Sequence, residues 1–142
     1  MIILIIDGTT NSHAGLNFEG ITRCFKNGGL FITEQVGPTN NYSLSSFLAE
    51  NYIPAYPENT MVNVISNLVD RGFQILKSDS FYPKIQFYDI GALVYYAKII
   101  SWEFPDFSVL KYQSELMHLQ RIIGQTGFIE SNEDRFLLVA KK

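Results

Sequence analysis

The sequence predicts one α/β domain spanning residues 1–142. Helix-like segments end at glycine and pass directly into strand-like segments at three places, after Gly28-Gly29, Gly72 and Gly127. The unbroken apolar run at the start of the chain is typical of a strand covered on both faces, and consists of Ile2, Ile3, Leu4, Ile5 and Ile6. A length of 142 residues is sufficient for one hydrophobic core. Repeated helix–glycine–strand units therefore indicate an α/β domain.

The first half of the chain alternates strands and helices. After the strand at residues 2–6 we expect a helix over residues 17–26 and a strand over residues 30–36. Asn41 or Ser43 can cap a short helix that runs to residue 51, and Pro54 and Pro57 then interrupt the chain. The apolar residues of the next helix share one face: Met61, Val62, Ile65, Leu68 and Val69.

The second half continues the alternation. Residues 73–81 and 84–88 predict two strands, or one long strand bent near Pro83. Residues 90–100 are expected to be helical, and Ser108 is expected to cap a final long helix. The apolar face of that helix carries Val109, Tyr112, Leu116, Leu119 and Ile123. Residues 128–131 and 135–140 predict a closing hairpin or a bulged strand around Asn132-Glu133-Asp134.

Composition and charge argue against several classes of partner. The chain has 11 Lys and Arg against 14 Asp and Glu, and its basic residues are scattered, whereas duplex binding requires a clustered basic face. The apolar run at residues 2–6 is far shorter than the ~20 residues that span a bilayer. It also lacks the basic flank of a signal peptide, and the acidic residue Asp7 follows it directly, which is not typical of a signal peptide. We therefore expect a cytoplasmic protein with neither a nucleic-acid nor a membrane partner.

Metal and common catalytic motifs are missing from the sequence. One cysteine, Cys24, permits neither a disulfide within the chain nor a cysteine-rich zinc site. His13 and His118 lie far apart in sequence, and His118 is expected to have a structural role in the last helix, so no metal is expected. The sequence contains no G-x-G-x-x-G, no G-x-x-x-x-G-K-[ST] and no G-x-S-x-G motif.

Polar side chains follow the first two predicted strands. Because ligands bind at the carboxyl ends of parallel strands, these side chains are candidate ligand contacts. They are Asp7, His13, Glu34, Gln35, Asn40 and Asn41. Each also has an ordinary explanation: Asp7-Gly8 is a turn former, the two asparagines suit turns and helix caps, and His13 suits a loop.

Aromatic residues are concentrated in one block. Nine of the 20 aromatic residues of the chain lie within residues 81–107. They are Phe81, Tyr82, Phe87, Tyr88, Tyr95, Tyr96, Trp102, Phe104 and Phe107. Aromatic side chains combine large apolar area with polar handles, so the block suits a substrate cap, a subunit interface or an ordinary core.

Three segments together resemble a known family. The first consists of Phe87-Tyr88-Asp89-Ile90-Gly91-Ala92-Leu93-Val94-Tyr95-Tyr96 and the nearby Trp102-Glu103-Phe104-Pro105-Asp106-Phe107. The second is Arg135–Lys141. The third is the helix end Arg23-Cys24-Phe25-Lys26-Asn27-Gly28-Gly29, which leads into residues 30–37. In this order they are similar to the C-terminal half of a Rossmann-like, S-adenosylmethionine (SAM)-dependent methyltransferase. The resemblance covers nearly the whole chain and is most specific in residues 87–107.

The resemblance implies a partial methyltransferase sheet with helices packed on it. Residues 2–6 would be the fourth strand, 30–36 the fifth, 73–88 the sixth and 135–140 a reversed seventh. In the family, SAM is held by a glycine-rich loop after strand one and an acidic residue after strand two, and neither has a counterpart in this sequence. Asp7 would remain only as part of the far wall of a cofactor pocket. No cofactor is therefore expected for the chain alone, and SAM is expected only if a partner completes it.

The resemblance also implies a set of residues on the substrate side, while no catalytic residue is assigned. These candidates are His13, Gln35, Asn40, Asn41, Asp89, Tyr95, Tyr96 and Trp102. Without its neighbouring strand, the run at residues 2–6 would form an open apolar edge, which predicts a homo-oligomer or a partner chain at this edge. Three hypotheses follow: a truncated methyltransferase-like domain inactive alone, half of a split methyltransferase, or a binding or dimerisation module that uses residues 81–107.

Overall fold

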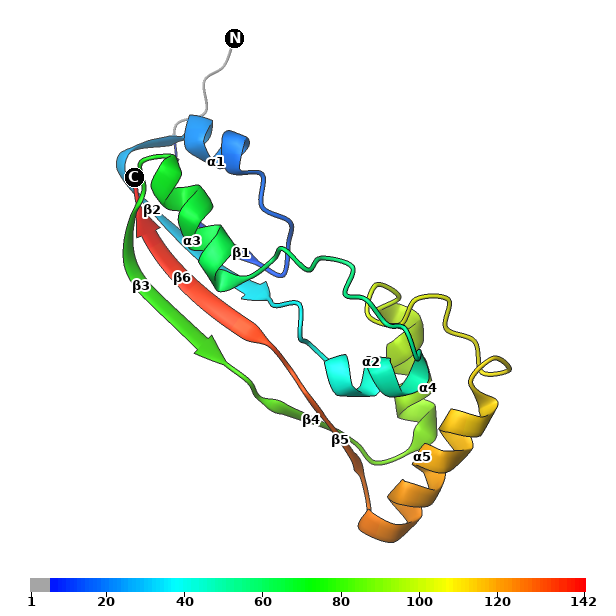
Figure 1. Ribbon diagram of the computed structural model, residues 1–142. Coiled ribbons are helices and arrows are strands. Elements are labelled where there is room, and N and C mark those ends of the chain that lie inside the picture. The colour runs from blue at the N-terminus through cyan, green and yellow to red at the C-terminus, as the bar shows by residue number, and fades with distance from the viewer. Residues whose placement is uncertain (1–5) are drawn as a thin grey trace. The chain divides into compact units, whose positions relative to one another are not determined.

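The computed structural model describes residues 6–142, which form two compact units (Figure 1). Of the described residues, unit 1 contains those up to Gly37 together with Glu58–Phe81 and Arg135–Lys142. Unit 2 contains Pro38–Pro57 and Tyr82–Asp134. The expectation that residues 1–142 behave as one domain stays a prediction, and each unit is described separately below.

Unit 1 is built on a four-stranded mixed sheet. The strands are β1 (Ile6–Ser12), β2 (Phe25–Val36), β3 (Gln74–Phe81) and β6 (Arg135–Lys141), in the order β1-β2-β6-β3. β1 and β2 run parallel, whereas β6 is antiparallel to both β2 and β3. The predicted α/β class and the reversal of the last strand are therefore confirmed.

The first strand ends later than the sequence predicts. β1 starts at Ile6, so most of the apolar run at residues 2–6 lies outside the described residues. Most of β1 is the polar segment Asp7–Ser12, and its pairing with residues 30–34 of β2 holds it in the sheet. The prediction that Asp7 follows the strand is wrong, because Asp7 is the second residue of β1.

The helix before β2 ends without a glycine cap. α1 (Phe18–Cys24) begins at Asn17, whose side chain accepts a hydrogen bond from the amide of Gly20 at 3.0 Å. The chain is already extended at Phe25, and Gly28 lies within β2 at a φ of 85°. The prediction that this glycine ends the helix is therefore wrong, since its left-handed conformation belongs to an irregular part of the strand.

The second helix of unit 1 ends as the sequence predicts. α3 (Met61–Asp70) is capped by Thr60, which accepts from the amide of Asn63 at 3.2 Å. At its end Gly72 adopts a φ of 85°, its amide bonds the Val69 carbonyl at 2.9 Å, and the amide of Phe73 bonds the Leu68 carbonyl at 3.0 Å. These two bonds form the glycine C-cap of a Schellman motif and lead directly to β3.

The buried face of α3 is narrower than predicted. Val64 and Leu68 are buried, but Val62 and Val69 are 71% and 51% exposed. α1 and α3 pack on one core of unit 1. Its buried members are Phe25, Phe31, Val64, Leu68, Phe73, Phe136, Leu138 and Ala140.

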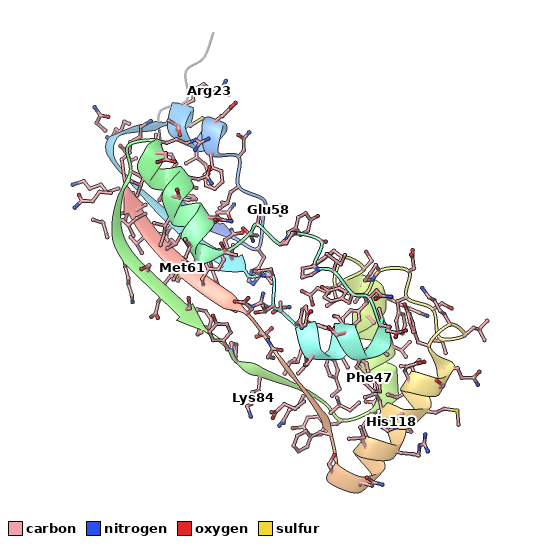
Figure 2. All side chains as sticks on the ribbon, in the orientation of Figure 1. Arg23, Phe47, Glu58, Met61, Lys84 and His118 are labelled. Atoms are coloured by element: carbon pink, nitrogen blue, oxygen red, sulfur yellow. The ribbon has the colours of Figure 1, made fainter. Side chains whose placement is uncertain are left out.

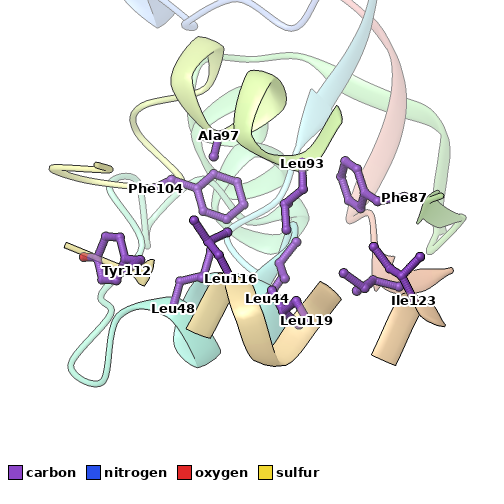
Figure 3. Close-up of a cluster of buried hydrophobic side chains, with 11 residues drawn as sticks. Leu44, Leu48, Phe87, Leu93, Ala97, Phe104, Tyr112, Leu116, Leu119 and Ile123 are labelled. Carbon is purple, nitrogen blue, oxygen red and sulfur yellow. The ribbon is translucent and has the colours of Figure 1, made fainter. Parts of the chain in front are cut away.

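Unit 2 combines three helices with a two-stranded sheet. Its elements are α2 (Tyr42–Leu48), β4 (Lys84–Phe87), α4 (Ile90–Ile99), α5 (Gln113–Thr126) and β5 (Ile129–Asn132). β4 and β5 pair antiparallel. Leucine and aromatic side chains from the helices and both strands form its core (Figure 3). The core contains Leu44, Leu48, Phe87, Leu93, Ala97, Phe104, Tyr112, Leu116, Leu119, Ile123 and Ile129.

The last helix and the end of the chain differ from the prediction in two respects. α5 begins at Gln113, while Ser108 holds the preceding turn through a bond from the Lys111 amide at 3.4 Å. The helix ends at Gly127, with a φ of 89°, as predicted. β5 pairs with β4 whereas β6 pairs with β2 and β3, so of the two predicted alternatives the hairpin is wrong, and a strand interrupted at Glu133-Asp134 agrees with the structure.

No helix within residues 6–142 is both long enough and apolar enough to cross a membrane.

Candidate functional site

The carboxyl ends of β1 and β2 meet at one edge of the sheet in unit 1, where side chains from both strands form a polar cluster. Gln35 is buried and donates from Nε2 to Asn11 Oδ1 at 2.7 Å and to Thr33 Oγ1 at 2.8 Å. The same Nε2 lies 3.2 Å from the carbonyl oxygen of Ala14, and Thr33 Oγ1 donates to Asn11 Oδ1 at 3.2 Å. The Gln35 amide therefore ties the loop after β1 to β2, which makes it a positioning group at this edge.

His13 lies at the same edge and remains exposed. Its backbone has a φ of 53°, and its amide donates to the Glu34 carbonyl at 3.1 Å. Its Nδ1 lies 2.7 Å from Ser12 Oγ, and its Nε2 lies 3.9 Å from Glu34 Oε1. An imidazole beside a carboxylate can hold or exchange a proton, so His13 and Glu34 are the groups at this edge that can contact a ligand.

Asp7 does not belong to this edge. It lies near the amino end of β1, its side chain is exposed, and it forms an ion pair with Lys26 of β2. The carboxyl edge of the parallel pair is at Ser12 and Val36. Asp7 therefore does not lie at the carboxyl end of the first strand, because the strand continues to Ser12, and its role in a cofactor pocket stays a prediction.

A buried carboxylate organises the polar residues of unit 2. Glu103 is buried, and its Oε1 accepts from Asn40 Nδ2 at 2.6 Å while its Oε2 accepts from Asn41 Nδ2 at 2.7 Å. The second hydrogen of Asn41 Nδ2 reaches the hydroxyl of Tyr96 at 2.9 Å. Bonds to an ionised group in a buried site are stronger than bonds between neutral groups. Asn40 and Asn41 therefore hold Glu103 in place, and the predicted pair lies inside the unit.

A second carboxylate extends this network. Asp134 Oδ2 accepts from the amide of Thr39 at 3.1 Å and from its hydroxyl at 2.6 Å. The amide of Asp134 donates to Asn40 Oδ1 at 2.9 Å, and Asn132 Nδ2 donates to the Thr39 carbonyl at 2.9 Å. Segments far apart in sequence are joined here by side chains, which fixes the turn at residues 38–41.

Asn41 and the nearby Tyr52 hydroxyl have unusual environments in unit 2. Asn41 has a φ of 52°, is fully buried, and its Oδ1 has no hydrogen-bond partner among the described residues. Burial raises the pKa of the Tyr52 hydroxyl above its ordinary value, and the negative charge of Glu103 raises it further. Tyr52 is therefore a neutral hydroxyl over the physiological pH range.

The aromatic candidates point in different directions. Tyr96 packs its ring between Phe87 and Phe104, with centroids 5.2 Å and 6.2 Å away. Tyr95 and Trp102 are 70% and 49% exposed. The core explanation therefore holds for Phe87, Tyr96 and Phe104, while the substrate-cap and interface explanations stay predictions for the exposed members of residues 81–107. Asp89 is exposed and caps α4 by accepting from the Ala92 amide at 2.8 Å.

Two exposed apolar side chains lie on α4. Tyr95 and Ile99 are 70% and 55% exposed and are four residues apart, so they share one face of the helix. Leu93 and Ala97 of the same helix are buried in the core. Tyr88 and Trp102 are also exposed, but they lie before and after the helix.

His118 has the structural role that the sequence predicts, although it is exposed. Its ring packs against Phe47 of α2, with centroids 5.6 Å apart (Figure 2). This contact joins α2 to α5. His118 belongs to unit 2, so His13 is the one histidine among the described residues of unit 1.

Unit 2 also has a shallow depression of about 430 Å³. It is lined by the segment after α2, by Pro105 and Asp106, and by the start of α5. Glu50, Lys111 and Glu115 supply charged groups to its walls, and Tyr52 and Tyr112 supply rings. None of the residues predicted from the sequence as substrate contacts lines it.

Two of the predicted candidates are not placed to contact SAM at the carboxyl edge of the strands. Asp7 lies away from the carboxyl edge, and the amide of Gln35 is used within the sheet. No three His, Cys, Asp or Glu side chains within residues 6–142 are grouped so that they could hold a metal ion.

Sequence reasoning missed the residue at the centre of the unit 2 network. Glu103 lies between Trp102 and Phe104, and a carboxylate flanked by aromatic residues is a sign of a buried, bonded acid. Its partners Asn40 and Asn41 were predicted as candidates, but their distance in sequence from Glu103 hides the contact. Asn11 and Thr33 were missed for the same reason.

Comparison with known proteins identifies the fold. No protein-family model and no curated protein matches the chain. Among solved structures, a protein from Bacillus halodurans described as a methyltransferase superposes with a TM-score of 0.55 at 13% identity, covering 96% of this chain and 69% of that chain. The YcgJ protein of Bacillus subtilis superposes with a TM-score of 0.52 at 13% identity, covering 100% of this chain and 66% of that chain. A protein of Galdieria sulphuraria described as a sarcosine dimethylglycine methyltransferase superposes with a TM-score of 0.46 at 14% identity, covering 96% of this chain and 52% of that chain.

These likenesses show that the chain has a methyltransferase-like, Rossmann-type fold. They agree with the mixed sheet and its reversed last strand. The chain spans 69%, 66% and 52% of the length of the three proteins.

Proposed function

We propose that these 142 residues form the substrate-side part of a SAM-dependent methyltransferase domain, and that they neither bind SAM nor transfer a methyl group alone. The strand order β1-β2-β6-β3, with β6 reversed, carries this proposal together with the likeness to a methyltransferase-type structure. The missing G-x-G-x-x-G motif and the internally bonded polar groups at the strand edge support the lack of SAM binding. A fold does not by itself specify an activity, so the cofactor measurement decides.

In a completed enzyme, the chemistry would be methyl transfer to a nucleophile of the substrate. His13 and Glu34 would lie at the substrate edge of the sheet, while Gln35 would position the loop that carries His13. Within unit 2, Asn40 and Asn41 would hold Glu103, and Tyr96 would bond Asn41, beside the exposed rings of Tyr95 and Trp102. These residues would act by orientation and by excluding water.

The exposed aromatic side chains favour a second candidate function. Tyr95 and Ile99 on α4, with Tyr88 before and Trp102 after the helix, are exposed apolar side chains, which suits a partner-binding module without catalysis. A split enzyme is a variant of the first proposal, in which another chain supplies the SAM-binding strands. The run at residues 2–6, most of which lies outside the described residues, remains our proposed contact for such a chain or for a second copy.

Calorimetric titration of the 142-residue chain with SAM tests the proposal. We expect no heat of binding up to millimolar SAM, while a class I methyltransferase of known affinity binds under the same conditions. A dissociation constant at or below about 100 μM, close to −5.5 kcal/mol, would contradict the proposal. Titration with S-adenosylhomocysteine is the matched control for binding that does not depend on the methyl group.

A further inference from the structure

The depression in unit 2 has the size of a site for a small ligand. Its volume of about 430 Å³ lies within the range of ~300–1,000 Å³ that is typical of ligand pockets. Its lining comes from two parts of unit 2, within residues 48–53 and 105–115. Leu48, Ile53 and Pro105 supply apolar surface to its walls. A ligand can therefore place an apolar part against these side chains.

Acidic groups outnumber basic groups in the lining of the depression. Glu50, Asp106 and Glu115 supply three carboxylates, and Lys111 supplies an ammonium group. Among the described residues, none of these four side chains forms an ion pair. Lys111 instead holds its Nζ over the ring of Tyr112, 5.0 Å from the ring centroid. The three carboxylates are thus left to attract a ligand, and the ligand that they favour is positively charged.

The hydroxyl of Tyr112 is a second sign of a ligand, independent of the acidic groups. Tyr112 lines the depression and is only 8% exposed, yet its hydroxyl has no hydrogen-bond partner among the described residues. Its ring is fixed by stacking on Phe107, with the centroids 5.8 Å apart. Figure 3 shows the hydroxyl on the side of the ring that points away from the rest of the core. Because the hydroxyl groups of largely buried side chains usually have a partner, this one is available to a ligand.

The arrangement of the carboxylates argues against a metal ion as that ligand. A divalent cation requires several ligand atoms at about 2.0–2.6 Å from one point. Within the described part of the chain, no group of three His, Cys, Asp or Glu side chains could hold such an ion. Glu50, Asp106 and Glu115 can instead be contacted together by an extended cation that carries several ammonium groups. A methylene chain between these ammonium groups suits the apolar part of the walls, as the stems of lysine side chains do.

We infer that this depression binds a linear aliphatic polyamine. The ammonium groups of the ligand would lie against Glu50, Asp106 and Glu115. The hydroxyl of Tyr112 would accept a hydrogen bond from one of them, and Ile53 would pack against the methylene chain. Exposed ion pairs each contribute little, so we expect a dissociation constant of about 0.1–1 mM at low salt.

Calorimetric titration of the 142-residue chain with spermidine tests the inference. We expect saturable binding that sodium chloride weakens, because the attraction between exposed charges is screened by salt. Absence of saturable binding up to about 10 mM spermidine would overturn the inference. The inference goes beyond the proposed function and does not rest on it, because SAM and spermidine are titrated separately and either titration can fail alone.

Two other ligands define the class of cation. Magnesium chloride should give no comparable binding, because the carboxylates do not converge on one point. Tri-lysine has the same net charge as spermidine and should bind more weakly, because its peptide backbone is bulkier than a methylene chain. Equal binding of magnesium would indicate a metal site, and tighter binding of tri-lysine would indicate a basic peptide. Either result would overturn the inference.

Three glutamine substitutions locate the site. Glu115→Gln removes one carboxylate from the wall and is expected to weaken spermidine binding about two- to fivefold. Lys111→Gln removes a repelling ammonium group and should strengthen binding by a similar factor. Glu58→Gln is the matched control, since Glu58 is exposed and does not line the depression. Equal weakening by Glu58→Gln and Glu115→Gln would show that overall charge attracts the polyamine and would refute the site.

Tyr112→Phe tests the free hydroxyl and separates a binding role from a structural one. The variant keeps the ring that stacks on Phe107 and removes only the oxygen. We expect it to weaken spermidine binding severalfold and to leave the urea midpoint of unfolding nearly unchanged, because the hydroxyl makes no bond in the free protein. Unchanged binding in Tyr112→Phe, with folding checked by far-UV circular dichroism, would contradict the inferred contact.

Discussion

At the scale of single residues, Glu103 is the buried carboxylate of unit 2 that accepts hydrogen bonds from both Asn40 and Asn41. Replacement by alanine leaves the Nδ2 groups of Asn40 and Asn41 without their carboxylate acceptors in a buried site. We expect Glu103→Ala to lower the free energy of unfolding by about 2–4 kcal/mol, because unsatisfied buried donors retain their full desolvation cost. Urea unfolding followed by the fluorescence of Trp102, the only tryptophan, measures this loss.

Two further variants identify the cause. Glu103→Gln keeps one acceptor oxygen, so we expect it to lose less stability than Glu103→Ala. Glu50→Ala removes an exposed carboxylate from the same unit and should change the free energy by less than about 0.5 kcal/mol. An equal effect of Glu50→Ala and Glu103→Ala would show that overall charge, not the buried bonds, is responsible.

The sequence could predict which residues follow a strand, but not which residues far apart in sequence contact each other in the candidate site. His13 and Gln35 were correctly assigned to one sheet edge, because the parallel pairing of β1 and β2 follows from the order of elements. Asp7 was misplaced, since its position depended on where the first strand ends. The contact of Asn40 with Glu103 joins residues 63 positions apart, and no periodicity in one sequence reports such a pair.

At the scale of elements, Gly72 and Gly124 form a natural pair for testing backbone conformation. Gly72 has a φ of 85° in the Schellman motif, whereas Gly124 lies within α5, and a Cβ atom at either position would meet nothing within 4 Å. We expect Gly72→Ala to cost about 1 kcal/mol, because an L-residue is strained in the left-handed region. Gly124→Ala should stabilise the protein by about 0.5–1 kcal/mol.

Thermal unfolding monitored by circular dichroism gives the sign of each effect. Opposite shifts of the melting temperature in the two variants are the expected result. Shifts in the same direction would mean that side-chain crowding or the unfolded state, and not φ, controls both positions.

The elements were predicted best where the pattern is apolar on both faces of a strand. The strands at residues 30–36 and 135–140 lie within β2 and β6 for this reason. The end of β1 was predicted too early, because an apolar run outranks the polar residues 7–12 that pair with β2. Of the two alternatives for residues 128–140, the hairpin was wrong, because the choice of sheet for β5 and β6 depends on tertiary pairing, whereas an interrupted strand agrees with β5 followed by β6.

At the scale of the whole molecule, the two units interrupt one another along the chain. Unit 1 is assembled from three separate segments, and unit 2 from the two segments between them. Each has its own core, and Asn40, Asn41 and Glu103, which are joined by buried hydrogen bonds, belong to unit 2. Separate cores allow separate opening, because local stability follows the contacts that each cooperative unit buries.

Hydrogen–deuterium exchange of Glu103→Ala tests whether the units open separately. We expect faster exchange in peptides from Pro38–Pro57 and Tyr82–Asp134, because the substitution removes the bonds of Asn40 and Asn41 to Glu103 there. Peptides from Glu58–Phe81 and Arg135–Lys142 should keep the protection of the original chain. The Glu50→Ala variant provides the baseline. A uniform loss of protection would instead establish residues 1–142 as one cooperative domain, since disruption of one core would then be transmitted to the other.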